Sequence, residues 1–348
     1  MIRHKYKTNM SRNLGHPGRR GMSMRKGMVA LALLSVFSCG LRVSVAAEPS
    51  YPTKPIELWA GYAPGAGTDL GARMLAENSK KYLGQEVTVV NKPGGGGRVA
   101  MTLVSKTKPD GYSLAAVTDS TVVFSPYFEE VPYKPLEDFT FVSSFGTQHF
   151  GMVVAADSPF NTVKDLVDFA RANPGKLSIS TTGVGNNTHV AWEAIALLEN
   201  LKVKIVPFSG AAPAVTNLLG GHVMVACTGS SGYALHLKAK KVKLLAILSE
   251  ERMEIYPNTP TLKELGYPIT FQGLYIVAGP KNMGKPVVKK LEEAFKKATE
   301  APSFIKLAED LETYSKRTLS SDELSEAMVR LSRRNGELFK KLGMGLKQ

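Results

Sequence analysis

Apolar and polar positions follow two alternating patterns along most of the chain. Short apolar runs favour buried strands, and the longer segments between them repeat apolar residues every three or four positions, as amphipathic helices do. The runs that we expect to be strands are residues 56–62, 85–91, 113–118, 150–157, 177–183, 204–210, 223–227, 244–248 and 271–280. The expected helices are residues 68–84, 98–108, 162–175, 187–200, 212–221 and 231–241, with two or three more in residues 285–348.

Strands and helices alternate through short loops, which predicts parallel strand pairing and an α/β fold. Two α/β units of similar size follow one another. In open α/β sheets, ligands bind beyond the carboxyl ends of the strands, so two such units facing each other predict a cleft. The expected helix ends are Thr68 or Asp69 as the cap of the first helix, Gly84 as its end, and Asn187 or Thr188 as the cap of the helix over residues 187–200.

The first candidate site is the turn "GYAPGAGTD", residues 61–69, between an expected strand and an expected helix. Free N–H groups at a helix start and the helix macrodipole, roughly half a positive charge, favour an anion there. Gly65 and Gly67 let the backbone approach a ligand closely, and Thr68 adds a hydroxyl donor. Asp69 cannot itself face an anion, so it caps the helix, holds loop waters or pairs with an amino group of the ligand. The alternative is a tight strand–helix turn that binds nothing.

A second candidate turn is "TTGVGNNTH", residues 181–189, and a third is "FSGAAPA", residues 208–214. In the second turn, the amides of Gly185 to Asn187 are expected to form an anion-binding nest. His189 falls in the first helical turn, where the dipole opposes a cation, so we expect it to be neutral. A packing or capping role is the alternative for His189. The glycine spacing does not match the nucleotide-binding motifs G-x-x-x-x-G-K-[ST] and G-x-G-x-x-G.

Residues 1–47 have the pattern of a secretory leader. This segment carries nine Lys or Arg and no acidic residue. Its apolar run, "GMVALALLSVF", is too short to span a bilayer, and Val45 and Ala47 are the small residues that a signal peptidase requires for a cut before Glu48. A retained anchor and a lipoprotein site at Cys39 are the alternatives. The rest of the chain has 35 basic and 30 acidic residues, so the total charge of +14 does not indicate nucleic-acid binding.

Enzymatic chemistry has little support in the sequence. No G-x-S-x-G nucleophile elbow and no H-E-x-x-H metal motif occurs. Cys227 is the one cysteine after the leader, and His222 and His236 flank it in sequence. A cysteine at the end of a strand is more often buried and inert than nucleophilic. We therefore expect no cofactor, no metal and no catalysis, with an exported hydrolase or transferase as the alternative.

Several motifs, taken in order, resemble those of the Bug family, the periplasmic solute receptors of tripartite tricarboxylate transporters. The motifs are "YPTKPIELWAGYAPGAGTD", "LGQEVTVVNKPGGGG", "PDGYSL", "NPGKLSISTTGVGNNTH", "VPFSGAAPAVTNLLGGHV" and "LLAILSEERMEIYPNTPTLKELGYP", and they spread over nearly all of residues 51–347. The resemblance implies a two-domain, flytrap-like periplasmic-binding-protein fold with a ligand cleft between the domains. It implies a discontinuous first domain, residues 48–147 with 275–348, and a second domain, residues 148–274.

The resemblance also implies that backbone amides of glycine-rich loops hold the ligand's carboxylate. Carried over to this sequence, the ligand-binding residues are Tyr62, Ala63, Gly65, Ala66, Gly67, Thr68, Asp69, Asp119, Ser120, Thr182, Gly183, Asn187, His189, Ser209, Gly210 and Ala211. Candidate aromatic walls are Trp59, Tyr62, Phe124, Phe208 and Tyr275. The chain departs from the family pattern at Ala66, a usual glycine, at Met224, a usual aspartate, and at Ser209, a usual cation. Without that cation, we expect a mono- or dicarboxylate rather than a tricarboxylate.

The expected function is that of an extracytoplasmic receptor, which captures a small carboxylate and delivers it to the membrane subunits of a tripartite tricarboxylate-type transporter. We expect a periplasmic monomer with no nucleic-acid partner. The alternative for the partner is a membrane kinase, on which the liganded protein would dock as a sensor.

Overall fold

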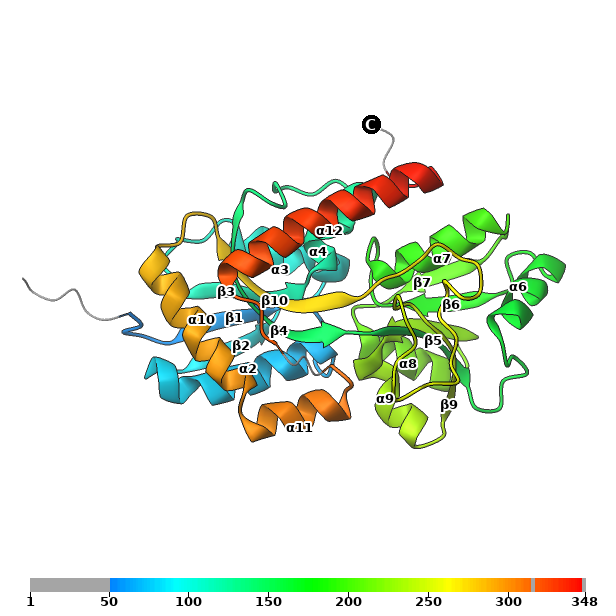
Figure 1. Cartoon of the computed structure of the whole chain (residues 1–348), viewed down its shortest axis with the longest axis horizontal. Helices are drawn as coiled ribbons and strands as arrows, with labels where there is room; N and C mark the ends of the chain where they lie inside the picture. Colours follow the sequence, from blue (N-terminus) through cyan, green and yellow to red (C-terminus); the bar gives the residue numbers. More distant parts are fainter. Residues whose placement is uncertain (1–50, 314–316, 346–348) are drawn as a thin grey trace, which may run out of the picture. The chain divides into compact units, whose positions relative to one another are not determined.

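The chain forms two five-stranded sheets, each covered by helices (Figure 1). The computed structural model describes residues 51–313 and 317–345, which belong to one unit, Pro49–Gln348. The expected leader, with Cys39 and the cleavage site after Ala47, lies outside the described residues. We call the sheet with strand order β2-β1-β3-β10-β4 the first sheet and the sheet with order β7-β6-β8-β5-β9 the second sheet.

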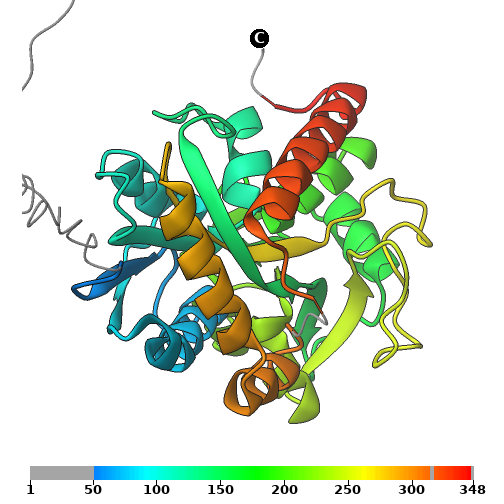
Figure 2. The same ribbon diagram turned by 60° about the vertical axis from the view of Figure 1, so that its left-hand side comes forward.

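The first sheet combines parallel and antiparallel strands. Its strands are β1 (Ile56–Ala60), β2 (Val87–Asn91), β3 (Ser113–Thr118), β4 (Phe139–Gln148) and β10 (Gly273–Pro280). β1 is parallel to β2 and β3, whereas β10 is antiparallel to β3 and β4. The helices on this side are α2 (Gly67–Leu83), α3 (Arg98–Val104), α4 (Ser120–Val123), α5 (Ser125–Phe128), α10 (Lys285–Thr299), α11 (Pro302–Asp310) and α12 (Ser321–Leu342). α10 and α12 lie along β4 (Figure 2), so the helical end of the chain packs on the first sheet.

The second sheet has the same mixture. Its strands are β5 (Phe150–Ala155), β6 (Ser178–Thr181), β7 (Lys204–Pro207), β8 (Val225–Gly229) and β9 (Val242–Ile247). β6 is parallel to β7 and β8, whereas β5 is antiparallel to β8 and β9. The helices on this side are α6 (Val163–Ala172), α7 (Asn187–Leu198), α8 (Ala211–Leu219) and α9 (Ser230–Lys238).

The α/β class is confirmed, but the expectation of parallel pairing is wrong for β5, β9 and β10, and β4, where no strand was expected, is antiparallel to β10 as well. The reason is the route of the chain between the sheets. β4 ends at Gln148 and β5 begins at Phe150, so the chain passes from the first sheet to the second across His149. After β9 of the second sheet, the chain returns to the first sheet as β10. The division at residues 147/148 and 274/275 stays a prediction.

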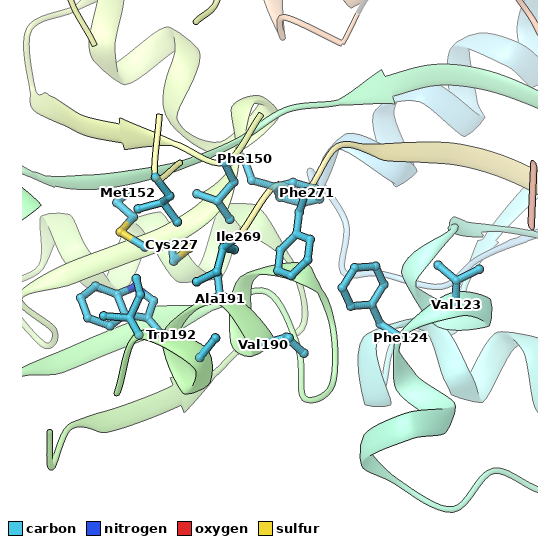
Figure 3. Close-up of a cluster of buried hydrophobic side chains, with 14 of the residues drawn as sticks. Val123, Phe124, Phe150, Met152, Val190, Ala191, Trp192, Cys227, Ile269 and Phe271 are labelled. Atoms are coloured by element: carbon cyan, nitrogen blue, oxygen red, sulfur yellow. The ribbon is translucent and has the colours of Figure 1, made fainter. Parts of the chain in front are cut away.

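One buried apolar cluster extends from the second sheet to the first (Figure 3). Met152, Cys227 and Trp192 are fully buried in the part beside the second sheet. Phe271 and Phe124 meet edge to face with 4.9 Å between ring centroids, and Phe124 lies between α4 and α5. Aromatic pairs favour this geometry. The two sheets are therefore joined by apolar packing as well as by the strands that pass between them.

Of the predicted helix ends, one is confirmed and two differ. α2 ends at Gly84, whose left-handed φ of 71° is the conformation that glycine tolerates best. Its N-cap is Ala66 rather than Thr68 or Asp69, because the helix already begins at Gly67. The N-cap of α7 is Asn186 rather than Asn187 or Thr188, and its side chain accepts a hydrogen bond from His189 N. These shifts decide which residues remain free at the helix starts.

Candidate functional site

The first predicted turn places an uncapped helix start at the carboxyl end of β1. β1 ends at Ala60, and α2 begins at Gly67 with Ala66 as an N-cap that has no side-chain hydrogen bond. The first N–H groups of a helix have no partner inside the helix. The N–H groups of Gly67 and Thr68 are therefore available to an acceptor from outside. The positive end of a 17-residue helix lies at the same place.

Asp69 holds this turn in shape. Its carboxylate is 2% exposed and accepts hydrogen bonds from Gly65 N at 2.9 Å, Asn91 Nδ2 at 2.7 Å and Arg73 Nε at 3.0 Å. Asn91 Nδ2 also approaches Tyr62 O at 3.0 Å. These contacts occupy the carboxylate with the loop itself, a role that differs from the cap, the water holder and the amino-group partner expected for Asp69.

The hydroxyl of Tyr62 is occupied by protein partners, so this residue can offer a ligand only its ring. Its hydroxyl donates to Gly96 O at 2.9 Å and lies 2.7 Å from Thr118 Oγ1, and burial raises the pKa of this phenol. Its ring edge, at Cδ1, is 3.6 Å from the position that a Cβ on Gly210 would take. Tyr62 therefore connects the first sheet to the loop before α8.

Two more uncapped helix starts come from the second sheet. α8 begins at Ala211 after Gly210, and α9 begins at Ser230 after Gly229, and neither N-cap offers a side-chain hydrogen bond. Gly210 has φ 141°, a backbone conformation that favours glycine. α8 and α9 touch each other at their first turns, because a Cβ on Gly232 would lie 2.9 Å from Ala211 Cβ.

The three uncapped starts meet one another. A Cβ on Gly210 would lie 3.1 Å from Ala66 Cβ, and a Cβ on Gly67 would lie 2.5 Å from Ser231 Oγ. Ala63 N donates to the carbonyl of Ser209, a residue exposed at its side chain, at 3.0 Å. Residues predicted separately at 63–69 and 209–211 are thus brought into direct contact. At the start of α9, Ser230 N already donates to His149 O at 2.7 Å. The donors that these contacts bring together are therefore the first N–H groups of α2 and α8 and those of α9 after Ser230, an arrangement that favours an anion.

The turn at residues 181–189 is built differently from its prediction. Thr182, Asn186 and Thr188 bond to one another through their side chains at 2.8 to 3.1 Å. A Cβ on Gly183 would lie 2.9 Å from Gly96 Cα, so this turn packs on the 3-10 turn Gly95–Gly97 of the first sheet's side. Burial lowers the pKa of His189, and its Nδ1 accepts from Gly185 N at 3.5 Å. His189 is therefore neutral, as predicted, with burial rather than the helix dipole as the main cause.

Three buried polar side chains of the second sheet and its helix α7 have atoms without a hydrogen-bond partner. Thr181 Oγ1 ends β6, Asn187 opens α7 with both amide atoms unpaired, and Thr228 Oγ1 lies in β8, 3.0 Å from the position of a Cβ on Gly232. All three are at most 1% exposed. Buried polar groups are almost always hydrogen-bonded, so unpaired ones call for an explanation, and a polar ligand is one.

Asp119 and Ser120 follow directly after β3. Ser120 Oγ is 2.7 Å from Thr118 Oγ1, which in turn contacts the hydroxyl of Tyr62. Asp119 is 1% exposed, accepts from Leu274 N at 3.1 Å, and has its pKa raised to about 7 by burial. Ser120 is thus linked through Thr118 to the hydroxyl of Tyr62, whereas Asp119 bonds to the start of β10.

The sequence did not identify the start of α9 as part of the site. Ser231 Oγ lies 3.4 Å from the hydroxyl of Tyr275, which was expected only as an aromatic wall. The signal was present, because "TGSSG" after the expected strand 223–227 is a glycine-rich turn like the other three. Gln148, at the end of β4, was missed for a different reason, since β4 itself was not predicted.

Other chemistry is not favoured by the described part of the chain. Cys227 is fully buried, and burial raises the pKa of its thiol, so no reactive thiolate forms there. No group of three His, Cys, Asp or Glu suited to a metal occurs among residues 51–313 and 317–345. Within the same residues, no helix combines the length and apolar character that crossing a membrane requires.

Comparisons with known proteins identify the family of the chain. The profile of the tripartite tricarboxylate transporter family receptor, TctC, matches residues 71–344. A Cupriavidus necator protein, named for its position in the 5′ region of gbd, is 33% identical over 330 residues, which are 93% of this chain and 99% of the relative.

Two solved structures share the fold. The periplasmic binding protein BugD has a TM-score of 0.78 and 27% identity over 85% of this chain and all of its own. MatC from Rhodopseudomonas palustris, solved with bound malate, has a TM-score of 0.76 and 25% identity over 82% of this chain and 98% of its own.

The family consists of solute-binding receptors and not of enzymes, so the hydrolase or transferase alternative has no further support. The two-sheet fold, the receptor role and the resemblance to Bug proteins are confirmed together. The chain belongs to the TctC family, the Bug-type receptors of tripartite tricarboxylate transporters.

Proposed function

We propose that this receptor binds one small carboxylate at the uncapped starts of α2, α8 and α9. The observation that carries the proposal is their direct contact: Gly67 abuts Ser231, and Ala66 abuts Gly210. Each helix start contributes roughly half a positive charge and free N–H donors. Together they balance a carboxylate without a permanent cation. The guanidinium of Arg73, which α2 itself carries, is paired with Asp69.

The buried polar atoms of the second sheet extend this donor set. Thr228 lies against the first turn of α9, and Thr181 and Asn187 lie at the neighbouring strand and helix ends. Hydroxyl and amide groups would bond a polar body attached to the carboxylate. Ser209, an uncharged residue, supports a ligand with one or two carboxylates rather than three. The malate found in MatC belongs to this chemical class.

Binding is coupled to closure of the two sheets on one another. Ala63 N and Ser209 O join the two sides directly, and the donor set is complete only when α2 meets α8 and α9. A ligand that bonds to both sides therefore favours the closed arrangement over an open one. This supports a receptor whose closed form is the one that the transporter's membrane subunits recognise.

A thermal-shift screen tests the ligand class. A ligand that binds only the folded protein raises its melting temperature by mass action. We expect a rise with a small mono- or dicarboxylic acid and none with the corresponding amide, because the amide lacks the charge that the helix starts stabilise. Equal rises in melting temperature for an acid and its amide would contradict the anion site.

We further propose that residues 1–47 are a leader that is cut before Glu48, and that the processed protein works outside the cytoplasm. Mass spectrometry of the processed chain checks the cut, and an N-terminal lipid on Cys39 would show the lipoprotein route instead. Uptake of the radiolabelled ligand separates transport from sensing. Uptake that is unchanged when the transporter's membrane subunits are deleted would contradict delivery to that transporter.

A further inference from the structure

A short segment at the end of α11 reaches from the first sheet's side to the second. It comprises Asp310, Leu311, Glu312 and Thr313, and we call it the strap. Its last residue is fixed to the first sheet, because Thr147 N of β4 donates to Thr313 O at 3.0 Å. Leu311, Glu312 and Thr313 are all buried. By its main chain, the strap therefore belongs to the first sheet's side.

The strap lies against α9, a helix of the second sheet's side, and α11 and α9 share one edge of the molecule (Figure 1). At the start of α9, Ser230 Oγ donates to Glu312 O at 3.0 Å. At the last residue of α9, Lys238 Nζ donates to Asp310 O at 3.4 Å. Main-chain carbonyls of the strap thus hold both ends of α9, whose start is one of the three that make up the proposed site.

The side chain of Glu312 reaches further into the second sheet's side. Tyr256, in the loop after β9, donates a hydrogen bond to Glu312 Oε1 and packs on the second sheet's own apolar cluster. The backbone of Glu312 has φ 56°, a left-handed conformation that residues other than glycine rarely adopt. Such a conformation persists only where its surroundings fix it, and here Ser230 and Tyr256 both bond to the residue.

Within the described residues, two buried polar atoms beside this hydrogen bond have no partner. They are Glu312 Oε2 and the hydroxyl of Tyr233 on α9. The two groups act on each other, because burial and, after it, the charge of Glu312 raise the pKa of Tyr233. Buried polar groups are almost always hydrogen-bonded. A movement of α9 toward the strap would let Tyr233 donate to Glu312, so this contact has room to tighten.

Separation of the two sheets acts directly on the contact. Tyr256 moves with the second sheet and Glu312 with the first, so opening stretches the hydrogen bond between them. Ser231, the residue after Ser230, meets Gly67 at the proposed anion site. Closure on a ligand and closure on the strap therefore position the same helix, α9, and each favours the other.

We propose, building on the proposed receptor function, that the strap is a closure device outside the ligand site, and that the hydrogen bond from Tyr256 to Glu312 is made in the closed form and broken in the open one. The strap slows the escape of a bound carboxylate without touching it. It thereby sets part of the affinity from a place where no ligand atom reaches.

Tyr256→Phe tests the proposal, because it removes the hydroxyl and keeps the ring. Titration calorimetry and stopped-flow dissociation use succinate, L-malate and any further acid that raises the melting temperature in the screen. Affinity should fall about tenfold or more, the effect of one hydrogen bond to a charged group, and mainly through faster dissociation. Tyr267→Phe is the matched control, because the hydroxyl of Tyr267 donates to Glu199 at 2.9 Å within the second sheet's side. The control should bind like the wild type.

Glu312→Asn is a second, independent variant. Asparagine tolerates the left-handed backbone, so the strap keeps its path, but the shorter side chain does not reach Tyr256. Affinity should fall as far as in Tyr256→Phe, and the double variant should bind no more weakly than either single one, since both changes remove one interaction. Hydrogen exchange of the wild type needs no variant to fold: the amides of residues 311–313 should exchange more slowly when the acid is bound.

The outcomes separate the two proposals. Wild-type affinity in both variants, equal losses in Tyr256→Phe and Tyr267→Phe, additive losses in the double variant, or exchange unchanged by the acid would overturn the closure role of the strap, and the carboxylate receptor would stand. If no acid in the screen raises the melting temperature of the wild type, the receptor proposal is overturned, and the strap proposal with it.

Discussion

Gly67→Ala is the change that most sharply tests the meeting of α2 with α9. Gly67 opens α2, and no positive φ restricts it to glycine. An added Cβ would lie 2.5 Å from Ser231 Oγ and 2.7 Å from Ser231 Cβ, and it would also press on the hydroxyl of Tyr275. Ser231 belongs to the second sheet's side, so the methyl group acts as a wedge between the two sides.

The magnitude follows from the size of the wedge. Inserting one methyl group into a packed contact costs about 1–3 kcal/mol. The clash with Ser231 falls on the closed arrangement, because separating α2 from α9 relieves it, whereas Tyr275 belongs to β10 of the first sheet and its hydroxyl must shift in either arrangement. Since about 1.4 kcal/mol corresponds to a tenfold change in an equilibrium constant, affinity should fall about 5- to 150-fold. The melting temperature without ligand should change little, since alanine is the better helix former by about 1 kcal/mol.

Titration calorimetry with the best acid from the screen measures this effect. Gly284→Ala is the matched control, because Gly284 also stands at the start of a helix and its added Cβ would find only Pro286 Cδ, at 3.9 Å. The control should bind like the wild type. Unchanged affinity for Gly67→Ala, in a folded protein, would refute the placement of the site between α2 and α9.

Three further predictions concern stability and reactivity. Asp119→Asn should stabilise the unliganded protein at pH 8 by a few kcal/mol, an order-of-magnitude figure, because the carboxyl ionises at about 3.8 when unfolded but near 7 when folded. The raised pKa makes the free energy of unfolding of the wild type fall as pH rises from about 4 to 7. The extra stability of the variant, measured by urea unfolding, should therefore vanish toward pH 4. Extra stability that does not depend on pH would contradict the raised pKa of Asp119. Phe271→Ala removes a ring that is 1% exposed and packed on Phe124 and should cost about 3–5 kcal/mol in the same assay; a loss below about 1 kcal/mol would show that this cluster does not join the sheets. Cys227 should react with a thiol reagent only after denaturation, and Cys227→Ala should bind ligand like the wild type, whereas fast labelling of the folded protein would show that the thiol is accessible.

Much of the fold could be predicted because the pattern is local. Each strand–helix unit shows its own change of period, and glycine marks ends such as Gly84. β4 escaped prediction because its sequence, "FTFVSSFGTQ", mixes small polar residues into a strand that is buried on both sides. The antiparallel pairing of β10 escaped prediction too, although residues 271–280 were expected to be a strand, because which sheet a strand joins depends on the path of the chain and not on its own residues.

The site, too, could be predicted from the sequence only in part. The turns at Gly65–Asp69 and Ser209–Ala211 were predictable from glycine placed after a strand. Their contact with each other and with Ser231 was not, because it depends on how two sheets pack. The roles of individual side chains also required partners to be known: Asp69 bonds to Gly65, Asn91 and Arg73, and this shows that it holds the loop.

A crystal structure of the processed protein with its tightest-binding acid would show where the carboxylate is held. The proposed site predicts a carboxylate whose oxygens lie within hydrogen-bonding distance of main-chain N–H groups at the start of α2 and at the start of α8 or α9. A carboxylate held instead by lysine or arginine side chains, or bound away from these three helix starts, would contradict it.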